Sequence, residues 1–247
     1  MNTTIGLLLV HAFPGDGSLW EKQSADLRAP GRPILAPSLP GFGGTPVPTA
    51  EPSLDDYADA LIREIDRAGW AKAVVCGLSM GGYVAFALWR RHQGRIAGLV
   101  LADAKAEADT EQGKTGRVAL AAKVRELGPE QTFFAATPPP WLREGSSQWP
   151  LLKATILRQP REAIAQAALA RAGRPDSLPD LASIHVPTAV IVGDADPICT
   201  LDNAKTMQAG IKGATLTVIR DAGHLASLEQ PEPFDAAVSE LLQRVGI

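Results

Sequence analysis

The sequence predicts an α/β protein with a mostly parallel sheet of about six to seven strands flanked by helices. Short continuous apolar runs, typical of strands buried on both faces, alternate along the 247 residues with helical patterns. Plentiful turn formers, 23 Gly and 20 Pro, separate these runs. The alternation breaks between about residues 107 and 185, where the chain is Ala-rich and shows no strand pattern. We therefore expect one sheet that carries a helical insertion.

Six runs have the strand pattern, because they are apolar without alternation. Strands that alternate with helices form a parallel sheet covered on both faces. The predicted strands span residues 5–10, 33–36, 73–76, 97–102, 188–192 and 215–219.

The clearest helix is predicted over residues 53–68, where apolar side chains recur at helical spacing. Ser53 and Asp56 form a capping-box-like start, and Gly69 is a stop signal. Further helices of the sheet-bearing part are predicted over residues 19–27, 80–91, 201–209 and 234–245.

The insertion is expected to form a helical cap over residues 107–185, carried on a core made of residues 1–106 and 186–247. Its aromatic side chains either pin the insertion to the core or contact a ligand, and the second interpretation predicts an apolar pocket rather than a carboxylate-binding one. The predicted helices span residues 116–127, 151–157 and 161–171, and the candidate substrate-binding residues are Phe133, Phe134, Trp141 and Trp149.

Composition excludes several classes of protein. The 27 acidic and 24 basic residues give a net charge of -3, which argues against a nucleic-acid or anionic-membrane surface. Two cysteines far apart in sequence, Cys76 and Cys199, argue against a disulfide scaffold or a cysteine zinc site and fit a reducing compartment. The apolar run 5–10 is too short for a signal sequence or a membrane span. We expect a soluble, cytoplasmic protein.

The sharpest local motif is Gly77-Leu78-Ser79-Met80-Gly81-Gly82, between a predicted strand and a predicted helix. A serine on such a tight turn takes a strained conformation that exposes its hydroxyl at the carboxyl edge of the sheet, and it needs small neighbours on either side. Gly77 and Gly81 meet that need, and the helix N-terminus favours developing negative charge. Ser79 is therefore the candidate nucleophile.

A serine nucleophile needs a general base, and only four histidines are available. His92 lies at the end of a predicted helix. His185 precedes a strand and therefore lies at the amino edge of the sheet, opposite Ser79. His11 follows the first strand, in a loop that is expected to contribute to oxyanion binding instead. His224 follows the last strand and precedes the last helix, which places it at the edge where Ser79 lies. It is the base by elimination and by position.

The histidine in turn needs a carboxylate to fix its tautomer. The predicted strand 188–192 is followed by Asp194 and Asp196, and strand 97–102 is followed by Asp103, so all three reach the correct edge. An acid between serine and histidine in chain order is characteristic of one fold class. Asp221 is interpreted as a turn residue that supports the His224 loop.

A tetrahedral intermediate also needs donors for its oxyanion. The backbone N–H of Met80 is one, and the loop after the first strand, where Phe13 lies, supplies the other. Taken by itself, the sequence of this loop is more typical of a Pro-Gly turn that has no catalytic role.

Together these motifs resemble those of the α/β-hydrolase family, in particular compact carboxylesterases and enzymes similar to 3-oxoadipate enol-lactonase. The resemblance implies Asp196 as the acid, because the family places it three residues after the glycine, although some members take it from the strand that precedes Asp103. Ala12 replaces a commoner glycine and Thr45 a usual serine. The motifs are His11-Ala12-Phe13-Pro14-Gly15, Gly41-Phe42-Gly43-Gly44, Gly77 to Gly82, Gly193 to Asp196 and Gly223-His224.

The resemblance implies a serine hydrolase that cleaves carboxylic esters or lactones of small molecules without cofactor or metal. A serine at position 79 excludes the branches of the family that use an aspartate nucleophile. A C-C bond hydrolase, a cofactor-free perhydrolase, a hydroxynitrile lyase and a non-catalytic small-ligand receptor remain open as alternatives. The oligomeric state is open as well.

Overall fold

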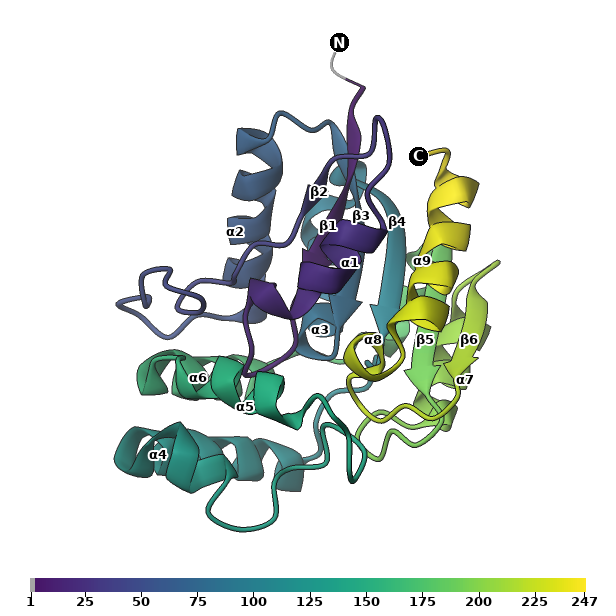
Figure 1. Ribbon diagram of the computed structural model, residues 1–247. Helices are drawn as coiled ribbons and strands as arrows, with labels where there is room; N and C mark the ends of the chain where they lie inside the picture. The colour runs from purple at the N-terminus through teal and green to yellow at the C-terminus, as the bar shows by residue number, and fades with distance from the viewer. Residues whose placement is uncertain (1–2) are drawn as a thin grey trace.

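The computed structural model describes residues 3–247 (Figure 1). Within this range six strands form one sheet in the order β2-β1-β3-β4-β5-β6, and every neighbouring pair is parallel. The parallel α/β class predicted from the sequence is therefore confirmed. The strands are β1 (Ile5–Val10), β2 (Ile34–Leu35), β3 (Lys72–Leu78), β4 (Ile96–Ala102), β5 (Thr188–Gly193) and β6 (Thr215–Ile219).

Burial differs between the centre and the edges of the sheet. The central strands β1, β3, β4 and β5 are almost wholly buried, as their continuous apolar runs predict. The expectation of burial on both faces is wrong for the edges: β2 has only two half-buried residues, and Val218 of β6 is 39% exposed. An edge strand has only one neighbouring strand, so part of its surface stays open to solvent.

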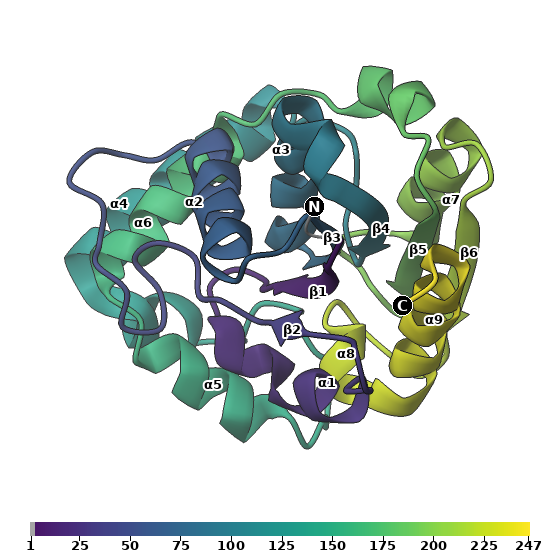
Figure 2. The same ribbon diagram turned by 90° about the horizontal axis from the view of Figure 1, so that it is seen from above.

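Helices cover both faces of the sheet (Figures 1 and 2). The helices α2, α3 and α7 lie on one face, and α1 and α9 lie on the other, with the one-turn helix α8 leading into α9. None of the helices in residues 3–247 is both long and apolar enough to cross a membrane. Their bounds are α1 (Glu21–Asp26), α2 (Leu54–Arg67), α3 (Met80–His92), α7 (Leu201–Gly210), α8 (Ala226–Glu229) and α9 (Pro231–Val245).

Local sequence explains where these helices begin. Ser53 accepts the N–H of Asp56, and the Asp56 carboxylate accepts the N–H of Ser53, so α2 starts with the capping box that the sequence predicts. The helix α3 has buried residues from Met80 to Trp89, because it is wedged between the sheet and α2. Its first residue is Met80, which directly follows Ser79.

The insertion between β4 and β5 is helical throughout its regular parts. Its helices α4 (Glu111–Phe133), α5 (Trp149–Leu157) and α6 (Arg161–Ala172) lie beyond the carboxyl ends of the strands (Figure 1). The helix predicted from residue 116 begins earlier, at Glu111, because the Thr110 side chain caps the N–H of Gly113. Gly128, with φ of 77°, and the following proline kink α4 at the predicted end.

Close packing at the start of α3 gives a first prediction. A Cβ on Gly81 would overlap the carbonyl oxygen of Val10, which is backbone and has no room to move. We expect Gly81→Ala to lower the free energy of unfolding by about 1–3 kcal/mol, measured by urea denaturation.

Gly94→Ala is the matched control, since a Cβ there meets nothing within 4 Å. Equal stability of both variants and the wild type would contradict the packing argument.

Candidate active site

The turn that carries Ser79 is strained and tightly packed. Ser79 has φ of 53° and ψ of -109°, a conformation that is costly for a residue with a side chain. Its N–H donates to the carbonyl of Ala102 over 2.8 Å. A Cβ on Gly77 would overlap the backbone of Gly81, so the turn tolerates only glycine at both positions. The hydroxyl of Ser79 is thereby held at the carboxyl edge of the sheet.

Three buried side chains form a continuous hydrogen-bonded line at this edge. Ser79 Oγ lies 2.7 Å from His224 Nε2, and His224 Nδ1 lies 2.8 Å from Asp196 Oδ2. The other oxygen of Asp196 accepts the N–H groups of Ile198 and Cys199, at 2.8 and 3.0 Å. The carboxylate therefore accepts a hydrogen bond from the proton on Nδ1, which leaves Nε2 as the acceptor for the serine hydroxyl. The sequence-predicted nucleophile, base and acid are brought together.

Asp103, the alternative acid, faces the backbone instead of the imidazole ring. Its fully buried carboxylate accepts the N–H of Gly193 at 2.9 Å and that of Ala226 at 3.0 Å. Burial, together with the nearby charge of Asp196, raises the pKa of Asp103 well above its ordinary value. Asp103 thus joins the loop that bears the acid to the loop that bears the histidine.

The other two aspartates at this edge both lie in turns, as the sequence predicts for Asp221. Asp194 Oδ1 accepts the N–H of Ala222 at 3.4 Å, and Asp221 lies exposed with its carboxylate 3.1 Å from the guanidinium of Arg143. Neither contacts His224.

His11 is buried and fully engaged. Its Nε2 accepts the N–H of Leu39 and its Nδ1 donates to the carbonyl of Ala12, both over 3.0 Å. Burial lowers the pKa of His11 to about 4, so the ring is neutral near pH 7. The ring ties the loop after β1 to the turn at residues 39–45, where the Thr45 hydroxyl bridges the Leu39 carbonyl and the Gly41 N–H.

The last two histidines lie away from Ser79. His92 Nε2 lies 2.7 Å from a carboxylate oxygen of Asp59. His185 Nδ1 donates to the carbonyl of Ser183, and its ring meets that of Trp89 edge to face.

The two predicted oxyanion donors border the same site. Throughout residues 3–247, no acceptor is bonded to the backbone N–H of Phe13 or of Met80. Met80 is the first residue of α3, so its N–H also lies at the positive end of the helix dipole. Gly81 packs against Val10 at the end of β1, which holds the Phe13 loop beside the nucleophile turn.

A cavity of about 310 Å³ opens onto Ser79 and His224. Of the four predicted substrate-binding aromatics, Phe133 and Trp141 form part of its wall. The complete wall consists of Phe13, Ser79, Tyr83, Arg117, Leu120, Thr132, Phe133, Pro139, Trp141, Arg171, Ile198 and His224.

Phe134 and Trp149 are not part of that wall. Phe134 follows Phe133 where α4 ends, and its ring lies under the ammonium group of Lys153, at 5.2 Å. Trp149 donates its ring N–H to the carbonyl of Arg143. Both side chains pack within the insertion, so they match the packing alternative left open by the sequence.

Residues 7–237 match the Alpha/beta hydrolase family. The chain belongs to this family. Its α/β-hydrolase fold, and the resemblance carried by the motifs, are thereby confirmed.

Relatives of this α/β hydrolase include esterases and enol-lactonases. It is 30% identical to 3-oxoadipate enol-lactonase 1 of Acinetobacter baylyi over 224 residues, 89% of this chain and 81% of the relative. A solved thermophilic esterase from Thermogutta terrifontis superposes with a TM-score of 0.91 at 36% identity, over 100% of this chain and 92% of that one. The enol-lactonase of Burkholderia xenovorans LB400 gives 0.87 at 25% identity, over 98% and 92%.

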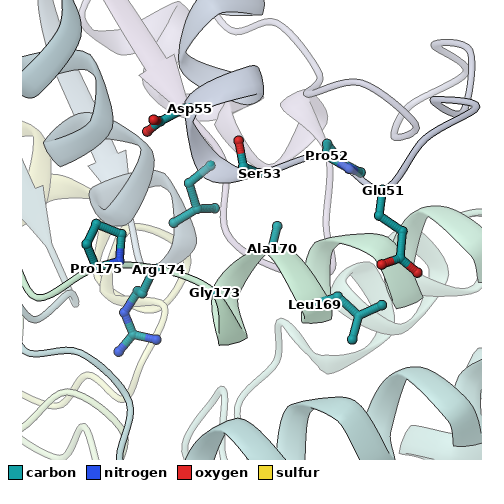
Figure 3. Close-up of a pocket in the computed structure, with 10 residues that line it drawn as sticks. Glu51, Pro52, Ser53, Asp55, Leu169, Ala170, Gly173, Arg174 and Pro175 are labelled. Carbon is teal, nitrogen blue, oxygen red and sulfur yellow. The ribbon is translucent and has the colours of Figure 1, made fainter.

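A second cavity of this α/β hydrolase, about 290 Å³, lies between the start of α2 and the end of α6 (Figure 3). Ser53 and Asp55 border it, but no histidine does. Arg174 contributes to its wall while its guanidinium turns away, toward Asp109 at 2.8 Å. The cavity therefore lacks a nucleophile with a base.

One group of potential metal ligands occurs in the described part of the hydrolase, Asp196, Cys199 and His224. Asp196 and His224 use the relevant atoms in bonds to each other. Burial raises the pKa of the Cys199 thiol, which keeps it protonated. The donor set is thus committed to the hydrogen-bonded line rather than prepared for a cation.

Sequence reasoning missed the charged part of the hydrolase cavity. It predicted an apolar pocket, yet Arg117 and Arg171 both line the cavity. Arginines in an Ala-rich helix are ordinarily exposed, so only the burial of α6 against the rest of the protein distinguishes Arg171.

The bridging position of Asp103 predicts a structural effect. In Asp103→Asn, one acceptor oxygen becomes an NH₂ group that faces a backbone N–H, so one buried N–H loses its partner. We expect the free energy of unfolding to fall by about 1–3 kcal/mol, measured by urea denaturation.

The exposed Asp194 supplies the control, since Asp194→Asn changes the same charge at the same edge. A stability of Asp103→Asn equal to that of the control would refute the bridging role.

Proposed function

We propose that this protein is a serine hydrolase that cleaves carboxylic esters or lactones of small molecules through an acyl-enzyme intermediate. The observation that carries the proposal is the unbroken line from Ser79 Oγ through His224 to Asp196, with 2.7 and 2.8 Å between successive atoms. It borders a cavity large enough for a small ester. The esterases and enol-lactonases among its relatives support the same chemistry.

In the first half of the reaction, Ser79 Oγ attacks the substrate carbonyl while His224 Nε2 takes the hydroxyl proton. Asp196 holds the ring and stabilises the imidazolium that forms. The N–H groups of Phe13 and Met80 donate hydrogen bonds to the carbonyl oxygen and stabilise the negative charge that develops on it. His224 then protonates the departing alkoxide, which leaves as an alcohol from an ester or stays attached to the acyl chain from a lactone.

In the second half, His224 removes a proton from water as the water attacks the acyl-enzyme carbonyl. Collapse of the second tetrahedral intermediate returns the proton to Ser79 and releases the carboxylic acid. The residues themselves supply every proton transfer, so the proposed reaction uses neither metal nor cofactor.

We also propose that residues 107–185 act as a cap over this site. Two side chains after α5 reach the core loop that follows β1: Arg158 lies 2.8 Å and Gln159 2.7 Å from the carboxylate oxygens of Asp16. Burial alone raises the pKa of Asp16, but these bonds and that from Ser18 outweigh it and hold the pKa below its ordinary value. The carboxylate therefore stays ionised and keeps the insertion attached.

A cytoplasmic location is also part of the proposed function, and it is based on the two unpaired buried cysteines.

The serine is tested by covalent labelling. We expect the wild type to react with a fluorophosphonate probe at one residue, Ser79, detected by mass spectrometry of the digested protein. Ser79→Ala should not label and should hydrolyse p-nitrophenyl acetate at least about 10³-fold more slowly, with an unchanged circular dichroism spectrum.

Ser53→Ala, a change on the exposed start of α2, is the control and should label as the wild type does. An unreactive wild-type serine would favour the non-catalytic receptor.

The choice of acid is tested by comparing two isosteric variants. Asp196→Asn should lower kcat by about 10⁴-fold, because the amide cannot fix the required tautomer. Asp103→Asn should lower kcat much less, because its carboxylate does not touch the ring. The reverse ranking in steady-state kinetics would make Asp103 the acid.

A further inference from the structure

Arg171 is a buried guanidinium in the wall of the cavity that Ser79 and His224 share. It projects from the last turn of α6, and only 8% of its surface is exposed. Its guanidinium carbon lies 3.5 Å from the centre of the Phe13 ring. Across residues 3–247 no oxygen accepts a hydrogen bond from its side chain, and its Nε is sealed off without a partner. The guanidinium group of Arg171 is thus held at the cavity without an acceptor for its N–H groups.

The neighbouring charges deepen this imbalance. Arg117 and Arg174 both hydrogen-bond or pair with the one carboxylate of Asp109. Three guanidinium groups therefore share a single negative charge, and the two other arginines already occupy it. Burial, and next the charge of Arg117, lower the pKa of Arg171 well below its ordinary value.

Burying a guanidinium without an anionic partner is unfavourable, and proteins seldom keep such a group without a function for it. An anion in the cavity would remove the imbalance. A carboxylate fits best, because its two oxygens match the planar fork of an arginine. The remaining wall is largely apolar, with Phe133, Trp141 and Leu120, and offers no second unpaired cation for a phosphate dianion.

We propose that Arg171 binds a carboxylate of the substrate, so that the preferred substrates are half-esters of dicarboxylic acids or lactones that bear a carboxylate. This inference rests on the proposed ester or lactone hydrolysis and specifies its substrate class. Its contact with Phe13 places the anion subsite next to the loop that offers the oxyanion donor. The aliphatic part of the substrate then spans the space between Arg171 and Ser79.

The test compares esters that differ only in a terminal carboxylate. Monomethyl glutarate is matched with methyl pentanoate, and the half-esters of succinate and adipate with methyl butanoate and methyl hexanoate. We expect the wild type to favour at least one half-ester by about tenfold or more in kcat/KM, measured by proton release. Wild-type hydrolysis of the neutral esters without such a preference would overturn the inference and leave the proposed function standing. A wild type that hydrolyses no ester and reacts with no fluorophosphonate would instead refute the proposed function.

Arg171→Gln removes the charge and should lower kcat/KM for the preferred half-ester by about 10–100-fold, mainly through KM. The loss for the matched neutral ester should be smaller by about tenfold or more, so the ratio of the two kcat/KM values is the readout. Arg171→Lys keeps the charge without the planar fork and should fall between the two, which provides a second variant if Gln does not fold. Equal losses on both members of an ester pair would mean that Arg171 only supports the fold, and would overturn the proposal.

Arg161→Gln is the matched control, because Arg161 begins the same helix on an exposed surface and its loss changes the net charge equally. A reduced preference for half-esters in this control would assign the effect to overall charge and would overturn the subsite.

Discussion

The active edge depends on one constraint: the backbone hydrogen bonding of the parallel sheet continues past the last residue of three successive strands. The N–H of Ser79 bonds to Ala102 at the end of β4, that of Asp103 to Ile191 of β5, and that of Asp194 to Ile219 of β6. Each loop therefore leaves the sheet in a position fixed by the next strand. Ser79 stands on this backbone ladder and Asp196 follows two residues after Asp194, while the N–H of Ala195 bonds to the carbonyl of Ala222 and so ties the His224 loop to the acid loop.

Asp103 extends the same constraint through its side chain. A buried carboxylate beside Asp196 is costly, as the raised pKa of Asp103 indicates. Its two oxygens satisfy backbone N–H groups of Gly193 and Ala226, which would otherwise be buried without partners. Positive φ angles at Ser79 and Asp103 add strain at the same edge. The fold thus tolerates destabilising features at the place where the acid and histidine loops must be held in register.

Sequence patterns predicted the features that depend on residues close together in the chain. Apolar runs located the six strands, the glycines around Ser79 located the turn, and strand order brought Ser79, Asp196 and His224 to one edge, where they lie. The patterns could not separate Phe133 from Phe134 or Arg171 from Arg161, because neighbours with the same chemistry differ only in what packs against them. The direction of Phe134 follows from the end of α4, and the burial of Arg171 from how α6 sits against α4 and the core. Such contacts join segments far apart in the chain and leave no periodic signal.

The position of Arg171 bears on how binding energy would be used. A carboxylate held at a distance from the reacting carbonyl is bound equally in the ground and transition states, so its contribution falls on kcat/KM through KM. The guanidinium also lies against Phe13, whose backbone N–H borders Ser79. An anion that draws the guanidinium toward itself acts on the same side chain that shapes the oxyanion loop. Substrate selection and oxyanion stabilisation therefore meet at one aromatic ring, and an effect of the carboxylate on kcat as well as KM would measure how strongly the two are coupled.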